Sequence, residues 1–147
     1  MSGAGTPNSA EMAARLRLSA TRLARRLRQE SGAGLTPSQL SALAVIDHHG
    51  PMTLGELAEM ERVAPPSVTK VVAKLETEGL VSRTSDPDDR RMARVATSEQ
   101  GAALIAESRR RKTAWLTDQI TGLNPAERQR LAAALDVLDQ LTGPGAP

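Results

Sequence analysis

The fold of this chain is decided by residues 53–81, which read TLGELAEMERVAPPSVTKVVAKLETEGLV. The stretch predicts two short helices joined by a tight turn. Thr53 and Glu56 have the spacing with which a hydroxyl and a carboxylate cap a helix reciprocally. Pro65 suits the first turn of the second helix, because the N–H that proline lacks is not needed there. Gly79 is placed to end that helix in the left-handed conformation.

The second helix of the pair has one apolar face. Its apolar residues recur with the i, i+3, i+4, i+7 spacing of a helix, and they are Val68, Val71, Val72 and Leu75. The polar residues away from this face are Ser67, Thr69, Lys70 and Lys74. Any solvated surface helix has the same pattern, so periodicity alone does not identify a helix that reads DNA. The residues that follow the helix are the ones that favour a DNA-reading helix over an ordinary surface helix.

A β-hairpin is predicted directly after the helix pair. Residues 80–84 and 92–97 alternate between apolar and polar side chains, and the Asp-Pro-Asp-Asp run between them favours a turn. Two helices followed by a hairpin is the order of a winged helix-turn-helix. The charged residues at the hairpin tip are Asp86, Asp88, Asp89, Arg90 and Arg91. A carboxylate there can orient a guanidinium for insertion into a minor groove, or the opposite charges can simply neutralise one another.

Four further helices are predicted around this unit, at residues 9–30, 37–49, 98–120 and 125–141. The helix at 98–120 is expected to begin with a capping box formed by Thr97 and Gln100. The helix at 9–30 would be about 33 Å long at the standard rise, which exceeds what a small domain needs and suggests a partner chain. Residues 1–8 are small and polar and 142–147 are rich in Gly and Pro, so a disordered N-terminus and a frayed C-terminus are expected.

Composition restricts the class of protein. The 147 residues fit one domain, and the 19 Lys and Arg against 17 Asp and Glu give a net charge of +2. Affinity for nucleic acid must therefore come from clustered charges. The absence of cysteine excludes disulfides, thiolate metal sites and cysteine catalysis. No apolar run is long enough to span a membrane and the N-terminus lacks a secretory signal, so a soluble cytoplasmic protein is expected.

The available side chains narrow the function further. Phe and Tyr are absent and Trp115 is the single aromatic residue, so single-stranded nucleic acid has no stacking platform, whereas duplex DNA can still be gripped through phosphates and groove edges. No Ser-His-Asp-like set and no Gly-rich phosphate loop is present, so neither an enzyme nor a cofactor is expected. His48 and His49 point about 100° apart on a helix and no third histidine exists. They are expected to complement the helix dipole, and no metal site is predicted.

Residues 51–104 resemble the DNA-binding lobe of MarR-type transcriptional regulators. They read PMTLGELAEMERVAPPSVTKVVAKLETEGLVSRTSDPDDRRMARVATSEQGAAL. With the flanking helices in the expected order, the resemblance covers about residues 9–141. It implies a mainly α fold with a small antiparallel β-hairpin. The winged helix-turn-helix lobe would be residues 36–97, and the helical dimerisation region would be 9–35 and 98–141. A homodimer that binds a pseudo-palindromic operator in double-stranded DNA is also implied.

The resemblance implies particular site residues as well. The helix from Pro65 to Glu78 would enter the major groove, and Arg90 at the wing tip, braced by Asp88 or Asp89, would enter the minor groove. The implied DNA-binding residues are Pro65, Pro66, Ser67, Thr69, Lys70, Lys74, Arg90 and Arg91, with Asp86, Asp88 and Asp89 bracing the wing. A small anionic or aromatic effector would lie between the dimer helices and the winged lobe, with His48, His49 and Trp115 as its candidate contacts.

The function implied by the resemblance is that of a sequence-specific, dimeric repressor that a small molecule releases from DNA. Sensing of peroxides through cysteine is excluded, because the chain has none. An alternative use of the same scaffold is a winged-helix module that binds another protein without reading DNA. The two differ in whether binding depends on the basic residues Lys70, Lys74 and Arg90.

Overall fold

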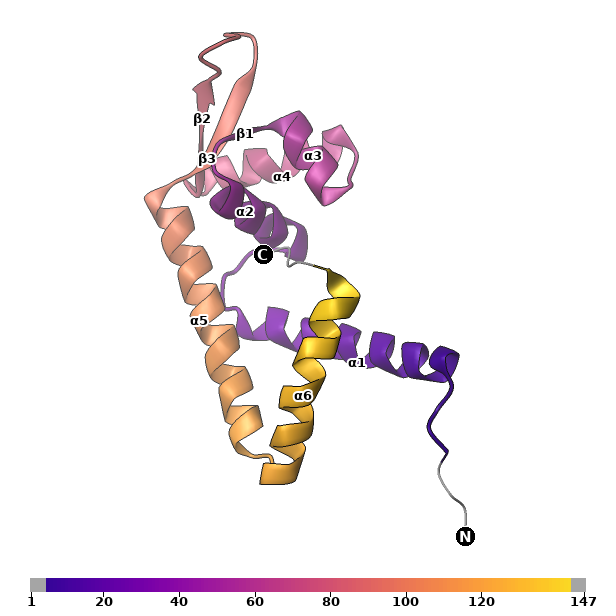
Figure 1. Ribbon diagram of the computed structural model, residues 1–147. Coiled ribbons are helices and arrows are strands. Elements are labelled where there is room, and N and C mark those ends of the chain that lie inside the picture. Colours follow the sequence, from indigo (N-terminus) through magenta and orange to yellow (C-terminus); the bar gives the residue numbers. More distant parts are fainter. Residues whose placement is uncertain (1–4, 144–147) are drawn as a thin grey trace.

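The computed structural model describes residues 5–143 (Figure 1). Within this range the elements are α1 (Ser9–Glu30), α2 (Pro37–His49), β1 (Met52–Thr53), α3 (Leu54–Glu61), α4 (Pro65–Thr77), β2 (Val81–Ser85), β3 (Ala93–Thr97), α5 (Glu99–Thr121) and α6 (Pro125–Thr142). The predicted mainly α fold with a small antiparallel sheet is confirmed. Of the predicted disordered and frayed ends, 1–4 and 144–147 lie outside the described residues, whereas Asn8 caps α1 and Thr142 is the last residue of α6.

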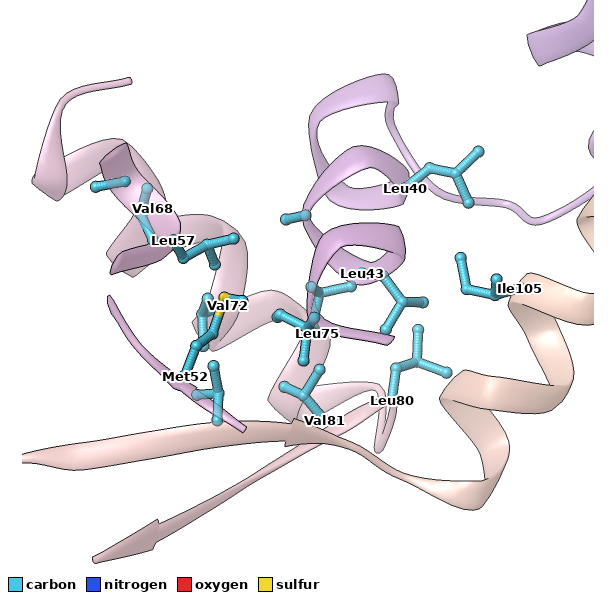
Figure 2. Close-up of a cluster of buried hydrophobic side chains, with 14 residues drawn as sticks. Leu40, Leu43, Met52, Leu57, Val68, Val72, Leu75, Leu80, Val81 and Ile105 are labelled. Atoms are coloured by element: carbon cyan, nitrogen blue, oxygen red, sulfur yellow. The ribbon is translucent and has the colours of Figure 1, made fainter. Parts of the chain in front are cut away.

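The winged lobe consists of α2, α3, α4 and a three-stranded sheet in which β3 lies between β1 and β2. Both strand pairs are antiparallel, and the longer pair aligns Val81 with Thr97 and Ser85 with Ala93. The largest side chains that are fully buried in the apolar core are Leu43, Ile46, Leu57, Leu75, Val72 and Val95. Burial of each such side chain is worth roughly 1.5–3 kcal/mol relative to exposure. Ile105 of α5 points toward Leu43 and Leu80 and thereby anchors α5 to the lobe (Figure 2).

The helix-turn-helix forms as its residues predict. Thr53 and Glu56 make the reciprocal capping box of α3, with Thr53 N–H donating to Glu56 Oε2 over 2.9 Å. The turn after α3 passes through Arg62 in the left-handed conformation at φ 54°. At the other end of α4, Gly79 has φ 73°, and the N–H groups of Gly79 and Leu80 donate to carbonyls of the last helical turn. Both ends of the motif are therefore fixed by local hydrogen bonds.

The start of α5 differs from the prediction by one residue. Ser98, rather than Thr97, is the N-cap, and its hydroxyl accepts the N–H of Gly101 at 3.1 Å. Thr97 is the last residue of β3 and pairs with Val81, so its side chain is set by the sheet. The Thr97 hydroxyl is buried without a hydrogen-bond partner. The predicted capping box of Thr97 and Gln100 is wrong, because pairing in the sheet continues through Thr97.

The remaining helices extend beyond the winged lobe. Figure 1 shows α1 projecting away from the lobe, and α5 and α6 diverging from the turn that joins them. Neither α1 nor α6 contains a buried residue. Between α1 and α5, the Arg26 guanidinium lies 5.3 Å from the centroid of the Trp115 ring, a cation–π contact. The large apolar side chains left exposed on α1 and α6 are Met12, Leu16, Leu18, Leu23, Leu135, Val137 and Leu141.

Candidate nucleic-acid interface

One face of α4 is exposed along its length. The predicted DNA-binding residues of this helix are all exposed, and they are Pro65, Pro66, Ser67, Thr69, Lys70 and Lys74. Two of them already have partners within the helix. The Thr69 hydroxyl donates to the Pro65 carbonyl at 3.1 Å, and Lys74 Nζ lies 2.9 Å from Glu78 Oε1. Lys70 makes no ion pair with any residue in the range 5–143, so its ammonium is available to a phosphate.

Asp86 closes the turn at the base of the wing. Its side chain is buried, and its Oδ1 accepts the Asp88 N–H while its Oδ2 accepts the Arg94 Nε–H, each over 2.8 Å. The Asp86 N–H donates to the Met92 carbonyl across the turn, also over 2.8 Å. The bond from the Asp88 amide, followed by the Arg94 guanidinium, holds the pKa of Asp86 below its ordinary value. The carboxylate therefore stays ionised and holds the turn at neutral pH.

Arg94 joins the wing to the helix-turn-helix. Besides its bond to Asp86, the guanidinium has Nη1 at 3.7 Å from Glu56 Oε2 and at 3.5 Å from the Pro51 carbonyl, to which it donates. Glu56 is also the carboxylate that caps α3. The hydrogen bond to Asp86 and the charge of that carboxylate raise the pKa of Arg94. One guanidinium thus ties together the wing turn, the segment before β1 and the start of α3.

The arginine that is braced at the wing tip is Arg91. Asp89 Oδ1 accepts the Arg91 backbone N–H at 3.0 Å and lies 3.3 Å from Arg91 Nε. Arg90 makes no side-chain hydrogen bond or ion pair with the residues that the structure describes, so the brace expected on Arg90 from Asp88 or Asp89 forms on Arg91 instead. The reason is local, since an Asp side chain reaches the backbone N–H two residues further on. Both arginines are exposed at the tip.

A second surface feature is a cationic hollow where the end of α1, α2 and α5 meet. It has a volume of about 420 Å³ and continues into a neighbouring hollow of about 260 Å³. The lining of the larger one is apolar apart from Arg28, Ser41 and Lys112, and its apolar residues are Pro37, Leu40, Ala44 and Val45. Burial lowers the pKa of Lys112, and the positive charges of Arg109 and Arg28 lower it further. The hollow therefore combines apolar walls with poorly compensated positive charge.

The neighbouring cations on α5 are largely neutralised. Glu107 Oε1 lies 2.7 Å from Arg110 Nη2 and 2.9 Å from Arg111 Nε, and these bonds lower the pKa of Glu107 to about 2. Arg109 Nη1 lies 3.9 Å from Asp47 Oδ2. Among the described residues, Lys112 is the member of this basic run without a carboxylate partner.

The residues predicted to contact an effector do not line this hollow. His48 and His49 are exposed at the end of α2, with their ring centroids 4.7 Å apart, and Trp115 lies under Arg26. Neither of the two hollows has any of the three in its lining. The sequence signal that would have found Arg28 and Lys112 is weak, because arginines crowd α1 and a basic run occupies α5. Only the packing of α1, α2 and α5 distinguishes these two from the rest.

Among residues 5–143, no group of three or more His, Cys, Asp or Glu side chains is arranged to hold a metal ion. Within the same range, no helix combines the length and apolar character needed to cross a membrane.

The fold and the exposed α4 define the chain as a winged helix-turn-helix protein. A model of the MarR family matches residues 35–92. The chain is also 41% identical over 132 residues to the HTH-type transcriptional regulator Mb0904 of Mycobacterium bovis, and the alignment covers 89% of this chain and 92% of that relative. The chain belongs to the MarR family of DNA-binding transcriptional regulators, which are not enzymes.

Two further similarities agree with this assignment. The solved structure of a candidate transcriptional regulator from Pseudomonas aeruginosa superposes with a TM-score of 0.82 at 34% identity, covering 95% of this chain and all (100%) of that one. A segment of 68 residues is 37% identical to the HTH-type transcriptional repressor MdtR of Bacillus subtilis, covering 46% of this chain and 44% of that protein. The predicted fold and family are therefore confirmed.

The bonds of Asp86 generate a prediction about the wing. In an Asp86→Asn variant, the backbone amide of Asp88 should exchange with solvent several-fold faster, because its charged acceptor is lost. In the native chain this protection should be present at pH values above the ordinary carboxyl range and be lost as pH falls through the lowered pKa of Asp86. Hydrogen exchange followed by NMR measures both. An Asp136→Asn variant on α6 is the control, and equal exchange in the two variants would contradict the role of Asp86.

Proposed function

We propose that this protein is a homodimeric repressor that binds a pseudo-palindromic operator through α4 and the wing, and that a small anionic ligand releases it. The observation that carries the proposal is the exposed α4 on the same lobe as a hairpin whose tip bears Arg90 and Arg91. Helix-turn-helix dimers place recognition helices about 34 Å apart, one turn of duplex. The similarity to the repressor MdtR supports repression as the sign of regulation.

The DNA contacts divide between the two elements. On α4, Ser67, Thr69 and Lys70 are exposed in the N-terminal half, which is the part of a recognition helix that meets base edges. At the wing, Arg91 is oriented by Asp89 while Arg90 is unpaired among the described residues, so two guanidinium groups are available for a minor groove. Lys74 contributes less than Lys70, because Glu78 already holds its ammonium.

Binding to duplex DNA can be tested with sequences selected from a random pool. Arg90→Ala and Arg91→Ala should each weaken the selected complex and lower the slope of log affinity against log salt by about 1 if the side chain meets a phosphate-lined groove. Lys70→Ala should do the same. Arg130→Ala on α6, an element remote from the wing in Figure 1, is the control. Recovery of no preferred duplex, or unchanged affinity in all three variants, would overturn the proposal.

The exposed apolar side chains of α1 and α6 support the proposal that the chain forms a dimer. Leu23 and Leu135 are 43% and 52% exposed, and Leu141 near the end of α6 is 67% exposed. Large apolar side chains repeated along two helices without buried neighbours need a partner surface. A second copy of this chain is the partner that two-fold symmetry of an operator requires.

Sedimentation at micromolar concentration should therefore give a dimer. Leu23→Glu and Leu135→Glu should each shift the equilibrium toward monomer, because a carboxylate would be buried in the interface. Met60→Glu is the matched control, since Met60 is an apolar residue of similar exposure, 45%, on α3. A monomer in the unmodified chain would exclude the dimer, and equal effects of Met60→Glu and Leu23→Glu would exclude this interface.

The cationic hollow supports the proposal of a small anionic effector. Its volume of about 420 Å³ lies within the range of small-molecule sites, roughly 300–1,000 Å³. Arg28 and Lys112 supply positive charge, and Leu40 and Val45 supply apolar walls. A carboxylate on an apolar or aromatic body matches this lining. The negative charge of such a ligand would oppose the effects of burial and of the nearby Arg109 and Arg28, which lower the pKa of Lys112.

Benzoate and its neutral counterpart benzamide form a suitable pair of probes. Benzoate should raise the Tm of the chain and weaken its complex with the selected duplex, whereas benzamide should do neither. Lys112→Met should raise the Tm without ligand, since it removes a charge that its surroundings disfavour, and should lower benzoate affinity roughly tenfold or more. Lys74→Met, which lies outside the hollow, is the control for the Tm and for benzoate affinity only. Equal responses to both probes, or an unchanged response in Lys112→Met, would contradict an anion site at Lys112.

A further inference from the structure

The first turn of α4 has no free backbone donor. Helix N-termini ordinarily present several free N–H groups, which bind phosphates. Here Pro65 and Pro66 have no N–H, and the next two N–H groups, of Ser67 and Val68, both donate to the Ala64 carbonyl at 3.0 Å and 3.4 Å. Ala64 itself is an N-cap without a side-chain hydrogen bond. This end of α4 is therefore not built to hold a phosphate.

The side chains of α4 also lack the groups that usually read bases. Residues 65–77 contain no Arg, Asn or Gln, the residues that make bidentate bonds to guanine or adenine. The Thr69 hydroxyl proton is used on the Pro65 carbonyl, and Lys74 is paired with Glu78. The hydrogen-bond donors that remain on this face are the Ser67 hydroxyl and the Lys70 ammonium. Hydrogen bonds alone give such a helix little power to discriminate among bases.

What this end of α4 does present is apolar surface. Val63 is 45% exposed, and Ala64, Pro65 and Pro66 that follow it are exposed as well. The backbone here is held rigidly, because Val63 N–H donates to the Ala58 carbonyl at 3.1 Å and two prolines follow. A rigid apolar edge at the start of a recognition helix fits the one apolar group in the major groove, the 5-methyl group of thymine.

We propose that the apolar edge formed by Val63, Ala64, Pro65 and Pro66 determines operator specificity by packing against thymine 5-methyl groups. This inference rests on the proposed function, because it needs α4 in the major groove of a duplex. It names the chemistry that the helix reads, which is methyl groups at fixed positions in each half-site. Lys70 and the wing arginines then supply affinity that depends little on sequence.

Replacement of thymine by deoxyuridine tests this contact, because it removes only the methyl group. The full chain is first used to select preferred duplexes from a random pool. Each thymine of the half-sites is then replaced in turn. We expect one or two positions per half-site at which the substitution weakens binding roughly threefold to fivefold, the worth of one buried methyl group. Thymines outside the half-sites serve as the control and should show no effect.

Protein variants assign the methyl contact to the apolar edge. In Val63→Ala and Pro66→Ala, the ratio of affinities for thymine and deoxyuridine duplexes should fall toward 1 at the sensitive position. Lys70→Ala should weaken both duplexes equally and leave the ratio unchanged. Specific binding that is indifferent to deoxyuridine, or a ratio that survives in both edge variants, would overturn the inference while leaving the proposed function intact. Failure to bind any duplex would instead remove the proposed function itself.

Discussion

The cluster of hydrogen bonds around Gly79 and Ser98 is the constraint on which the rest of the structure depends. Leu80 N–H donates to the Leu75 carbonyl at 2.9 Å to end α4, and the Leu80 carbonyl accepts the Ser98 N–H at 3.0 Å. The Ser98 hydroxyl donates to the Gly79 carbonyl at 2.6 Å while it caps α5. Gly101 packs so closely on the Leu80 carbonyl that a Cβ atom would collide with it. The end of the recognition helix, both strands of the wing and the start of α5 are thus held in one joint.

These hydrogen bonds also connect the proposed ligand site to the winged lobe. Beyond it, α5 contributes Ile105 to the core of the winged lobe and Lys112 to the cationic hollow. The same helix would therefore contact the proposed ligand, and its first residues are hydrogen-bonded to the end of α4. Since the hollow lies between α1, α2 and α5 and not against α4, an anion bound there would act on the angle between α5 and the lobe. In the proposed dimer, release of DNA would then follow from a change in the separation of the two recognition helices.

The elements that sequence predicts well are those fixed by neighbours in the chain. The capping box of α3, the proline that starts α4 and the left-handed Gly79 all depend on neighbouring residues, and the structure has each of them where the sequence predicts it. Thr97 was misassigned because a Thr that could cap a helix can equally pair in a sheet, and the pairing partner is sixteen residues away, at Val81. Other features depend on tertiary packing. Arg94 reaches Asp86 and Glu56 only in the folded lobe. Likewise, Arg28 and Lys112 line the same hollow only because α1 and α5 pack together. No spacing in the sequence distinguishes these residues from the other basic ones.

The electrostatics of the lobe support the proposal that affinity and specificity for DNA come from different groups. The recognition helix has only two lysines, and the acidic Glu76 and Glu78 lie near its end, paired with Arg83 and Lys74. Its face is therefore too weakly charged to supply the counterion release that drives association with duplex DNA. Exposed cations near the helix and the wing include Arg62 in the turn before the helix, Lys70 on it, and Arg90 and Arg91 at the wing tip, whose base the bonds of Asp86 hold in place. Because charge binds DNA with little regard to sequence, the proposed discrimination by this helix would depend on shape and apolar contact, and its start, with prolines at the first two helical positions, offers both.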